Sequence, residues 1–66
     1  MKIYVEKEKK NLEIDSKNAK DGRELLEQLK INPATIILVK NNEVVLEDEV
    51  LEDTDEIKIL SVISGG

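Results

Sequence analysis

One short amphipathic helix lies near the middle of the sequence, and this helix limits the fold more than any other feature. Asp21 is a good N-cap residue, and Glu24 is placed three positions later to complete a reciprocal capping arrangement. The apolar face is formed by Leu25, Leu26 and Leu29. Asn32-Pro33 is expected to end the helix, giving a length of roughly 15 Å. A helix this short is stable only when packed, and it can cover one face of one sheet.

A hairpin is expected before the helix. Residues 2–7 and 12–15 alternate with a period of two, which is typical of strands, and a polar turn at 9–11 separates them. Two interpretations are open for the lysines in and beside this turn, Lys7, Lys9 and Lys10. They form either a docking patch for an anionic partner or a solvated turn, and we prefer the solvated turn.

A second hairpin is expected after the helix, with its turn at Asn41-Asn42. Asparagine tolerates the positive φ angles of a two-residue turn, and this pair lies between the apolar segments 35–40 and 43–46. The turn fixes the register, which pairs Lys40 with Glu43, Val39 with Val44, and Leu38 with Val45.

Both faces of this second hairpin are apolar, so one face is expected to pack on the helix and the other to remain open. The helix side would be formed by Ile36, Leu38 and Val45. The open side would be formed by Ile37, Val39, Val44 and Leu46. An apolar open face often marks a binding site. Ordinary strand residues, partly covered by Lys and Glu stems, are the alternative interpretation.

The last strand, 57–62, is the most apolar and follows no tight turn. It is therefore expected in the middle of the sheet, parallel to the first strand. Its helix-facing residues would be Ile57, Ile59 and Ser61, and its open-face residues Lys58, Leu60 and Val62. The order of elements predicts an α+β domain in which a mixed sheet of four to five strands clasps one helix.

The residue content excludes most enzymatic chemistry. The 66 residues form one domain, 1–66, for which folding buries only about 60% of the unfolded surface, leaving little room for a catalytic cavity. With no His and no Cys, we expect no enzyme and no bound metal or cofactor. The net charge of −5 argues against nucleic acid, and the longest apolar run, 36–39, is far shorter than the roughly 20 residues that span a membrane. No apolar signal stretch follows Met1, and we expect a cytoplasmic monomer.

An acidic stretch covers residues 47–56, where seven of ten side chains are Asp or Glu. Calcium binding is one interpretation, but the stretch lacks the alternating oxygen ligands, central Gly and distal Glu of an EF-hand loop. A solvated connection is preferred. Val50 and Leu51 are expected to tuck under the core.

The sequence ends in an apolar strand followed directly by two glycines. Glycine has no Cβ, so this pair can thread a narrow channel and present an unhindered carboxylate. At Val62-Ile63-Ser64-Gly65-Gly66 the sequence resembles the ubiquitin-like sulfur carriers of the ThiS/MoaD family and the archaeal ubiquitin-like small modifier proteins. The helix segment 23–29 is also similar to theirs, although Gly22 stands where that family commonly has an apolar residue.

This resemblance implies a β-grasp, ubiquitin-like fold with a flexible Gly-Gly tail. Family members are activated as C-terminal adenylates by an E1-like partner that uses ATP. They then receive sulfur from a donor and carry it as a thiocarboxylate, or are joined to lysines of target proteins. By the resemblance, Gly65 and Gly66 form the activated end.

The surface expected to contact the activating partner consists of Ile37, Val39, Leu60, Val62, Ile63 and Ser64. Lys58 resembles in position a lysine of the archaeal modifiers and is a candidate acceptor for another copy's C-terminus. A solubilising lysine is the simpler interpretation.

The competing function is a non-catalytic β-grasp interaction module whose Gly-Gly end is incidental. Among carriers, the residues leave the pathway open between thiamine, molybdopterin, tRNA thiolation and protein modification.

Overall fold

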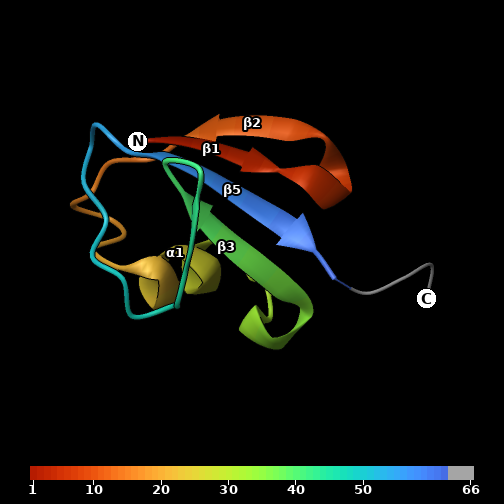
Figure 1. Ribbon diagram of the computed structural model, residues 1–66. Helices are drawn as coiled ribbons and strands as arrows, with labels where there is room; N and C mark the ends of the chain where they lie inside the picture. The colour runs from red at the N-terminus through yellow and green to blue at the C-terminus, as the bar shows by residue number, and fades with distance from the viewer. Residues whose placement is uncertain (63–66) are drawn as a thin grey trace.

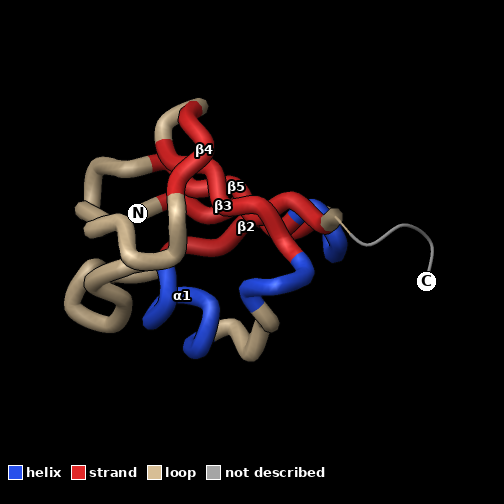
Figure 2. Tube along the Cα trace, turned by 60° about the horizontal axis from the view of Figure 1, so that its bottom comes forward, coloured by secondary structure: helices blue, strands red, loops and turns tan. Residues whose placement is uncertain are grey.

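Five strands form one mixed sheet in the part of the chain that the structure describes, residues 1–62, and one helix packs on one side of it (Figure 1). This description rests on a computed structural model. The elements in chain order are β1 (Lys2–Val5), the 3-10 helix η1 (Glu6–Glu8), β2 (Lys10–Glu13), α1 (Gly22–Gln28), the 3-10 helix η2 (Pro33–Thr35), β3 (Ile36–Lys40), β4 (Glu43–Val45) and β5 (Glu56–Ser61). The strand order is β2-β1-β5-β3-β4. The α+β class and the β-grasp arrangement are confirmed, and Figure 2 shows α1 beneath the sheet.

The last strand, β5, lies in the centre of the sheet, as expected. It runs parallel to β1, with Ile3 opposite Ile57 and Val5 opposite Ile59. It runs antiparallel to β3, with Leu38 opposite Ile59. Strand partners point to the same face of a sheet, so these residues form one continuous apolar side. Since a central strand is hydrogen-bonded along both edges, β5 is held firmly along its length.

The core lies between this apolar side and α1. Its largest fully buried side chains are Ile3, Leu25, Leu26, Ile57 and Ile59. Leu29, Ile36 and Val45 are partly buried and pack against it. Burial of each such side chain stabilises the fold by about 1.5 to 3 kcal/mol. The predicted packing of the helix leucines on the sheet is confirmed, and no helix within residues 1–62 is long and apolar enough to cross a membrane.

The second hairpin has the predicted turn and register. Asn41 and Asn42 adopt φ angles of 50° and 69°. The strand pairs are Leu38 with Val45, Val39 with Val44, and Lys40 with Glu43. Strand β4 ends at Val45, one residue earlier than expected.

The first hairpin differs from the prediction at its turn. Strand β1 ends at Val5, and η1 occupies residues that the alternation had placed in the strand and turn. Lys9 reverses the chain with a φ of 49°, and its N–H donates to the Glu6 carbonyl at 3.1 Å. Strand β2 therefore begins at Lys10. Polar side chains do not prevent this pairing, because β2 is an edge strand whose other side is solvated.

Helix α1 ends earlier than predicted. The Lys30 N–H donates to the Glu27 carbonyl and the Ile31 N–H to the Leu26 carbonyl, which is the hydrogen-bond pair of a Schellman motif. Lys30 takes the left-handed position of this motif, with a φ of 58°. The expected stop at Pro33 is wrong, because Pro33 begins η2 instead. A lysine in a position that usually holds glycine gives no stop signal in the sequence.

Asp21 caps the start of α1, but the return hydrogen bond predicted from the Asp21 N–H to the Glu24 side chain is not formed. The Asp21 Oδ1 accepts from the Glu24 N–H at 2.9 Å, as expected. The Glu24 carboxylate accepts from the Lys20 N–H at 3.1 Å, one residue away from the predicted donor. Asp21 itself is in extended conformation and forms a β-bridge with Val50.

This bridge is part of a close crossing between the helix start and residues 47–51. The Gly22 N–H donates to the Glu49 carbonyl at 3.1 Å, and the Arg23 N–H donates to the Glu47 carbonyl at 2.7 Å. Leu51 is buried, as predicted. Val50 is 66% exposed, so the expectation that it tucks under the core is wrong.

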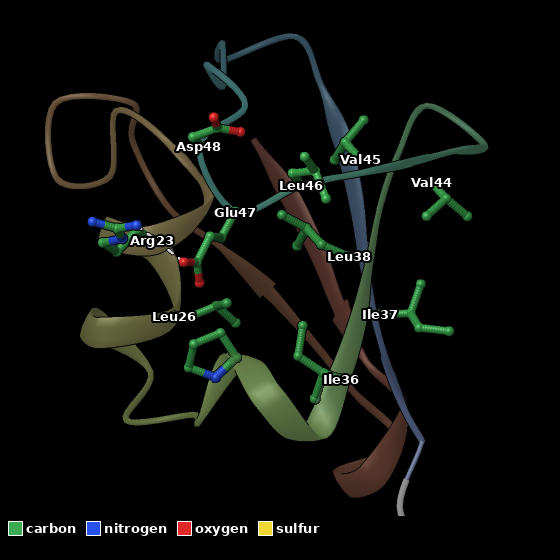
Figure 3. A pocket seen from close by; sticks show the side chains of 11 residues that line it. Arg23, Leu26, Ile36, Ile37, Leu38, Val44, Val45, Leu46, Glu47 and Asp48 are labelled. Atoms are coloured by element: carbon green, nitrogen blue, oxygen red, sulfur yellow. Dashed lines mark hydrogen bonds and ion pairs between the residues drawn. The ribbon is translucent and has the colours of Figure 1, made fainter.

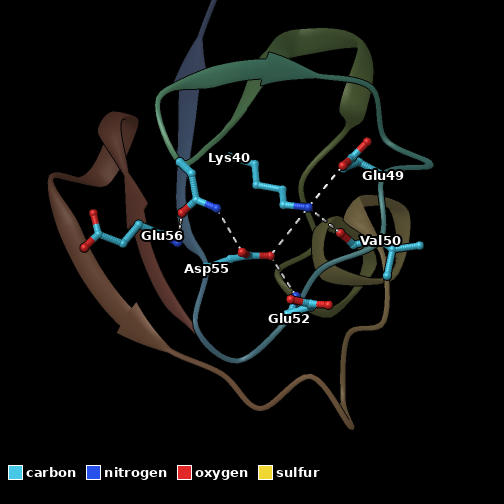
Figure 4. Close-up of polar contacts among 7 residues, drawn as sticks. Lys40, Glu49, Val50, Glu52, Asp55 and Glu56 are labelled. Atoms are coloured by element: carbon cyan, nitrogen blue, oxygen red, sulfur yellow. Dashed lines mark hydrogen bonds and ion pairs between the residues drawn. The ribbon is translucent and has the colours of Figure 1, made fainter.

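Several carboxylates of the acidic stretch form a polar network with the turn of the second hairpin (Figure 4). The Lys40 ammonium donates to Glu49 at 3.0 Å and to the Val50 carbonyl at 2.9 Å, and it lies 3.7 Å from Asp55. Asp55 is 5% exposed and accepts from the Asn41 amide at 2.9 Å. The stretch is therefore a partly buried, ion-paired connection and not the wholly solvated one that the sequence suggested.

Candidate functional site

The candidate site begins where β5 ends. The Ser61 N–H donates to the Glu6 carboxylate at 3.3 Å, on the β1 side of the strand. On the β3 side, the Val62 N–H donates to the Thr35 carbonyl at 3.0 Å. The chain is thus held from both edges up to Val62, by residues of η1 and η2. The four residues Ile63, Ser64, Gly65 and Gly66 lie outside the described residues.

Sequence reasoning did not find Glu6 and Thr35. Glu6 lies 55 positions before Ser61, and only the strand order brings the two together. The sequence predicts Thr35 in a strand, whereas it ends η2 and its carbonyl accepts from the Val62 N–H. No local pattern in the sequence signals either contact.

The face of the sheet opposite α1 carries several of the residues predicted to bind a partner. We define the open face as Tyr4, Ile37, Val39, Val44, Lys58 and Leu60. The register sets Ile37 opposite Leu60 and Val39 opposite Lys58. Ile37 is 39% exposed and Leu60 half-buried. Val62, next along the chain, is 50% exposed.

Val39 differs from its neighbours on the open face, because only 8% of its surface is exposed. It lies in a row between Lys58 and Val44. Its side chain therefore offers little exposed area to a partner, although it lies on the same face as the contact residues. The expected contact surface includes Ile37 and Leu60, which face each other across β3 and β5.

Lys58 lies in the middle of β5 on this face and is exposed. Its strand partners are Tyr4 on β1 and Val39 on β3. It makes no ion pair within residues 1–62. An ammonium in this position can meet a partner that covers the sheet.

A cleft of about 490 Å³ lies between α1 and the strands β3 and β4, mostly on the helix side of the sheet (Figure 3). Ile36 lies on the helix side of β3, and Ile37 lies on the opposite side. On the α1 side of the cleft the exposed Arg23 guanidinium donates to Glu47 at 3.0 Å. This hydrogen bond, together with the charge of Glu47, raises the pKa of Arg23. The lining is mostly aliphatic, so the cleft suits side-chain contact and not acid–base chemistry.

The described residues contain no group of three or more acidic, His or Cys side chains arranged to hold a metal ion. The described residues offer a firmly held strand end and an apolar face beside it.

Comparisons with known proteins give one family. The model that describes the ThiS family matches residues 2–66. The chain is 46% identical over 55 residues to the sulfur carrier protein TtuB of Thermus thermophilus. This alignment covers 82% of this chain and 83% of TtuB. It is 41% identical over 63 residues to an uncharacterised protein of Archaeoglobus fulgidus, which covers 96% of this chain and 91% of that protein.

Proposed function

This chain belongs to the ThiS family, and from that premise we propose that it is a ubiquitin-like sulfur carrier activated at Gly66 by an E1-like enzyme. The name of the Thermus relative supports the carrier role, and the Gly65-Gly66 end supplies the group to be activated. The chain acts as the carried substrate of this chemistry and not as its catalyst.

The observation that carries the proposal is that the end of β5 is fixed by hydrogen bonds to η1 and η2. Because the chain is hydrogen-bonded on both sides up to Val62, the terminal segment starts from a defined point. Four residues follow, and fully extended they reach about 14 Å. An activating enzyme that docks on the open face must therefore place its nucleotide within about that distance of Val62.

The proposed chemistry needs no side chain of the carrier. The Gly66 carboxylate attacks the α-phosphorus of ATP, a C–O–P linkage forms, and pyrophosphate leaves. Hydrosulfide then attacks the Gly66 carbonyl carbon, a C–S bond forms, the C–O bond to AMP breaks and AMP leaves, and loss of the S–H proton yields the thiocarboxylate. With neither His nor Cys in the sequence, the base and the metal ion come from the activating enzyme.

Intact-mass measurement tests this proposal. With the cognate E1-like enzyme and ATP, the chain should gain AMP at its C-terminus while pyrophosphate is released. With sulfide added, the mass should instead rise by the difference between sulfur and oxygen. Deleting Gly66 withdraws the carboxylate by about 3.3 Å, which is beyond what reactive geometry tolerates, so activation should disappear.

Two further variants make the test specific. Gly65→Val should also block activation, because a β-branched side chain widens and stiffens the segment. Val50→Ser, at an exposed residue of the acidic stretch, is the control and should be activated normally. If no ATP-dependent product forms with a demonstrably active cognate enzyme, and partner binding survives both tail changes, the chain is an interaction module instead.

The same activated carboxyl can be transferred to a lysine, and the exposure of Lys58 favours it as an acceptor on another copy. In that case a digest of native conjugates should contain a Gly-Gly remnant on Lys58, and Lys58→Arg should remove it. A digest with remnants on other proteins but none on Lys58 would leave this residue as a solubilising lysine.

A further inference from the structure

A second groove lies on the helix side of the molecule, directly beside the point where β5 ends. We call it the tail-exit groove. Its apolar lining is formed by Val5, Leu29, Ile31, Ile36 and Ile59. Ser61 also lines it, and its volume is about 640 Å³. The open face and this groove therefore flank the same strand end from opposite sides.

The rim of the tail-exit groove carries positive charge. Lys7 and Lys30 line it, and both are exposed. Lys10 is paired with Val5 across the first hairpin, so it shares the face of the sheet on which the groove lies. These three lysines make no ion pair within residues 1–62. Glu8 is the acidic residue in the lining.

This local charge contrasts with the rest of the molecule. The whole chain has a net charge of −5, and the acidic stretch 47–56 lies at the end of the molecule away from the exit of the chain (Figure 1). Charge is thus unevenly distributed along the molecule, with the lysine rim at the end where β5 finishes and the acidic stretch at the opposite end. Such a charge distribution orients an approaching partner and raises the rate of productive encounter.

We propose that the tail-exit groove docks a segment of the activating enzyme in which an aliphatic side chain is flanked by carboxylates. The inference rests on the proposed function and adds a second contact to the open face. The aliphatic side chain would fill the lining beside Ile31 and Ile36, and the carboxylates would meet Lys7 and Lys30. The partner would then hold the strand end from both faces, which fixes the direction in which the terminal segment leaves.

A second copy of this chain is the competing occupant, because its acidic stretch is complementary to the lysine rim. Head-to-tail binding of this kind forms rings or open chains of copies and would produce association that grows with concentration. Sedimentation of the wild-type chain separates the two cases. The proposal expects no association that depends on Lys7 and Lys30, and concentration-dependent association abolished by Lys7→Glu with Lys30→Glu would overturn it.

The direct test measures pyrophosphate release against carrier concentration with the cognate E1-like enzyme. The double variant Lys7→Glu with Lys30→Glu should raise KM by about tenfold at low ionic strength and leave kcat unchanged. The effect should shrink with added salt, because the screening length falls to about 10 Å at 0.1 M. The neutral double variant Lys7→Gln with Lys30→Gln should fall between the wild type and the charge reversal.

The matched control is Lys17→Glu with Lys20→Glu, which changes the net charge equally at exposed residues outside the groove. Its KM should equal that of the wild type. An equal increase of KM in the control and in Lys7→Glu with Lys30→Glu would show that only net charge matters. No increase of KM in either of these two variants would exclude the groove. If the wild-type chain is not adenylated at all, the proposed function fails and this inference falls with it. Adenylation with an unchanged KM refutes the groove alone.

Discussion

Gly22 has no room for a side chain. A Cβ at this position would lie 2.5 Å from Leu38 Cδ2 and 2.8 Å from the Glu47 carbonyl oxygen. The sequence showed Gly22 only as a departure from the family pattern at a helix start. The structure gives the physical reason, which is the close crossing of residues 47–49 over the first turn of α1.

We expect Gly22→Ala to destabilise the protein by about 1 to 3 kcal/mol, because the methyl group must displace a core side chain and a backbone carbonyl. Alanine normally stabilises a helix relative to glycine by about 1 kcal/mol, so the sign of the effect is informative. The measurement is the urea midpoint. Gln28→Ala, at an exposed position of the same helix, is the control and should change stability by less than about 0.5 kcal/mol. Equal or greater stability for Gly22→Ala would contradict the crossing.

Asp55 is the buried carboxylate of the polar network. Burial by itself would raise the pKa of Asp55, but hydrogen bonds from the Glu52 N–H and the Asn41 amide, together with the charge of Lys40, outweigh burial and lower it. A carboxyl whose pKa is lower in the folded state than in the unfolded state stabilises the fold while it is ionised. That contribution is complete above the unfolded value of about 3.9 and is lost as the pH falls through the folded pKa.

The free energy of unfolding should therefore fall as the pH decreases from about 5 to about 2. Asp55→Asn should lower stability at pH 7 by about 1 to 3 kcal/mol, since donors around the carboxylate lose their charged acceptor, and it should flatten the acid part of the profile. Asp53→Asn is a useful comparison. The pKa of Asp53 is also lowered, mainly by the Ser16 N–H, but its side chain is 62% exposed, so the loss at pH 7 should be smaller. An unchanged acid slope in Asp55→Asn would contradict this assignment.

Helix α1 has only seven residues, about 10 Å of length, so its stability comes from packing and not from its own hydrogen bonds. Leu25 and Leu26 are both almost completely buried, and Leu29 is partly buried at the cap. The sequence predicts a longer helix that ends at Asn32-Pro33. Residues 29–32, beyond the observed end at Gln28, contain no fully buried side chain.

Leu26→Ala should destabilise the domain by about 2 to 5 kcal/mol, because it leaves a cavity between α1 and the sheet. In a domain of this size that loss is a large share of the total stability. Leu29→Ala should cost less, because Leu29 is only partly buried. Urea unfolding followed by circular dichroism measures both. A midpoint unaffected by Leu26→Ala would show that the helix face is assigned wrongly.

At the level of the whole molecule, the sheet leaves one apolar face beside the exit of the chain. Leu60 and Ile37 are paired across β5 and β3 on this face, and Val62 follows on the exposed strand end. A partner that activates the terminal carboxyl must bind close to this end. The open face is therefore expected to form the main docking surface of the proposed carrier.

Leu60→Asp should weaken binding to the adenylating enzyme by about 2 kcal/mol or more, the effect typical of a buried apolar anchor at an interface. Isothermal titration calorimetry with the cognate enzyme measures this change, and circular dichroism verifies that the variant is folded. Val50→Asp places the same charge on an exposed residue of the acidic stretch, away from the open face, and should bind normally. Undiminished affinity of a folded Leu60→Asp variant would move the docking surface elsewhere.

The sequence by itself determined the features that depend on neighbouring residues. The Asn41-Asn42 turn determined the register of the second hairpin, because a two-residue turn leaves one pairing. The leucine spacing fixed the helix face, and the apolar character of β5 predicted its central place. The Gly65-Gly66 end pointed to the family.

Only the tertiary structure decided the features that join distant residues. The contact of Glu6 with Ser61, the close approach of residues 47–49 to Gly22 and the burial of Val39 depend on how strands and loops are arranged, not on local propensity. The end of α1 at Gln28 belongs to the same class, because Lys30, a non-glycine residue, is held in the left-handed conformation by the surrounding hydrogen bonds. Local patterns carry no information on such contacts, since the residues that make them meet only when the sheet is complete.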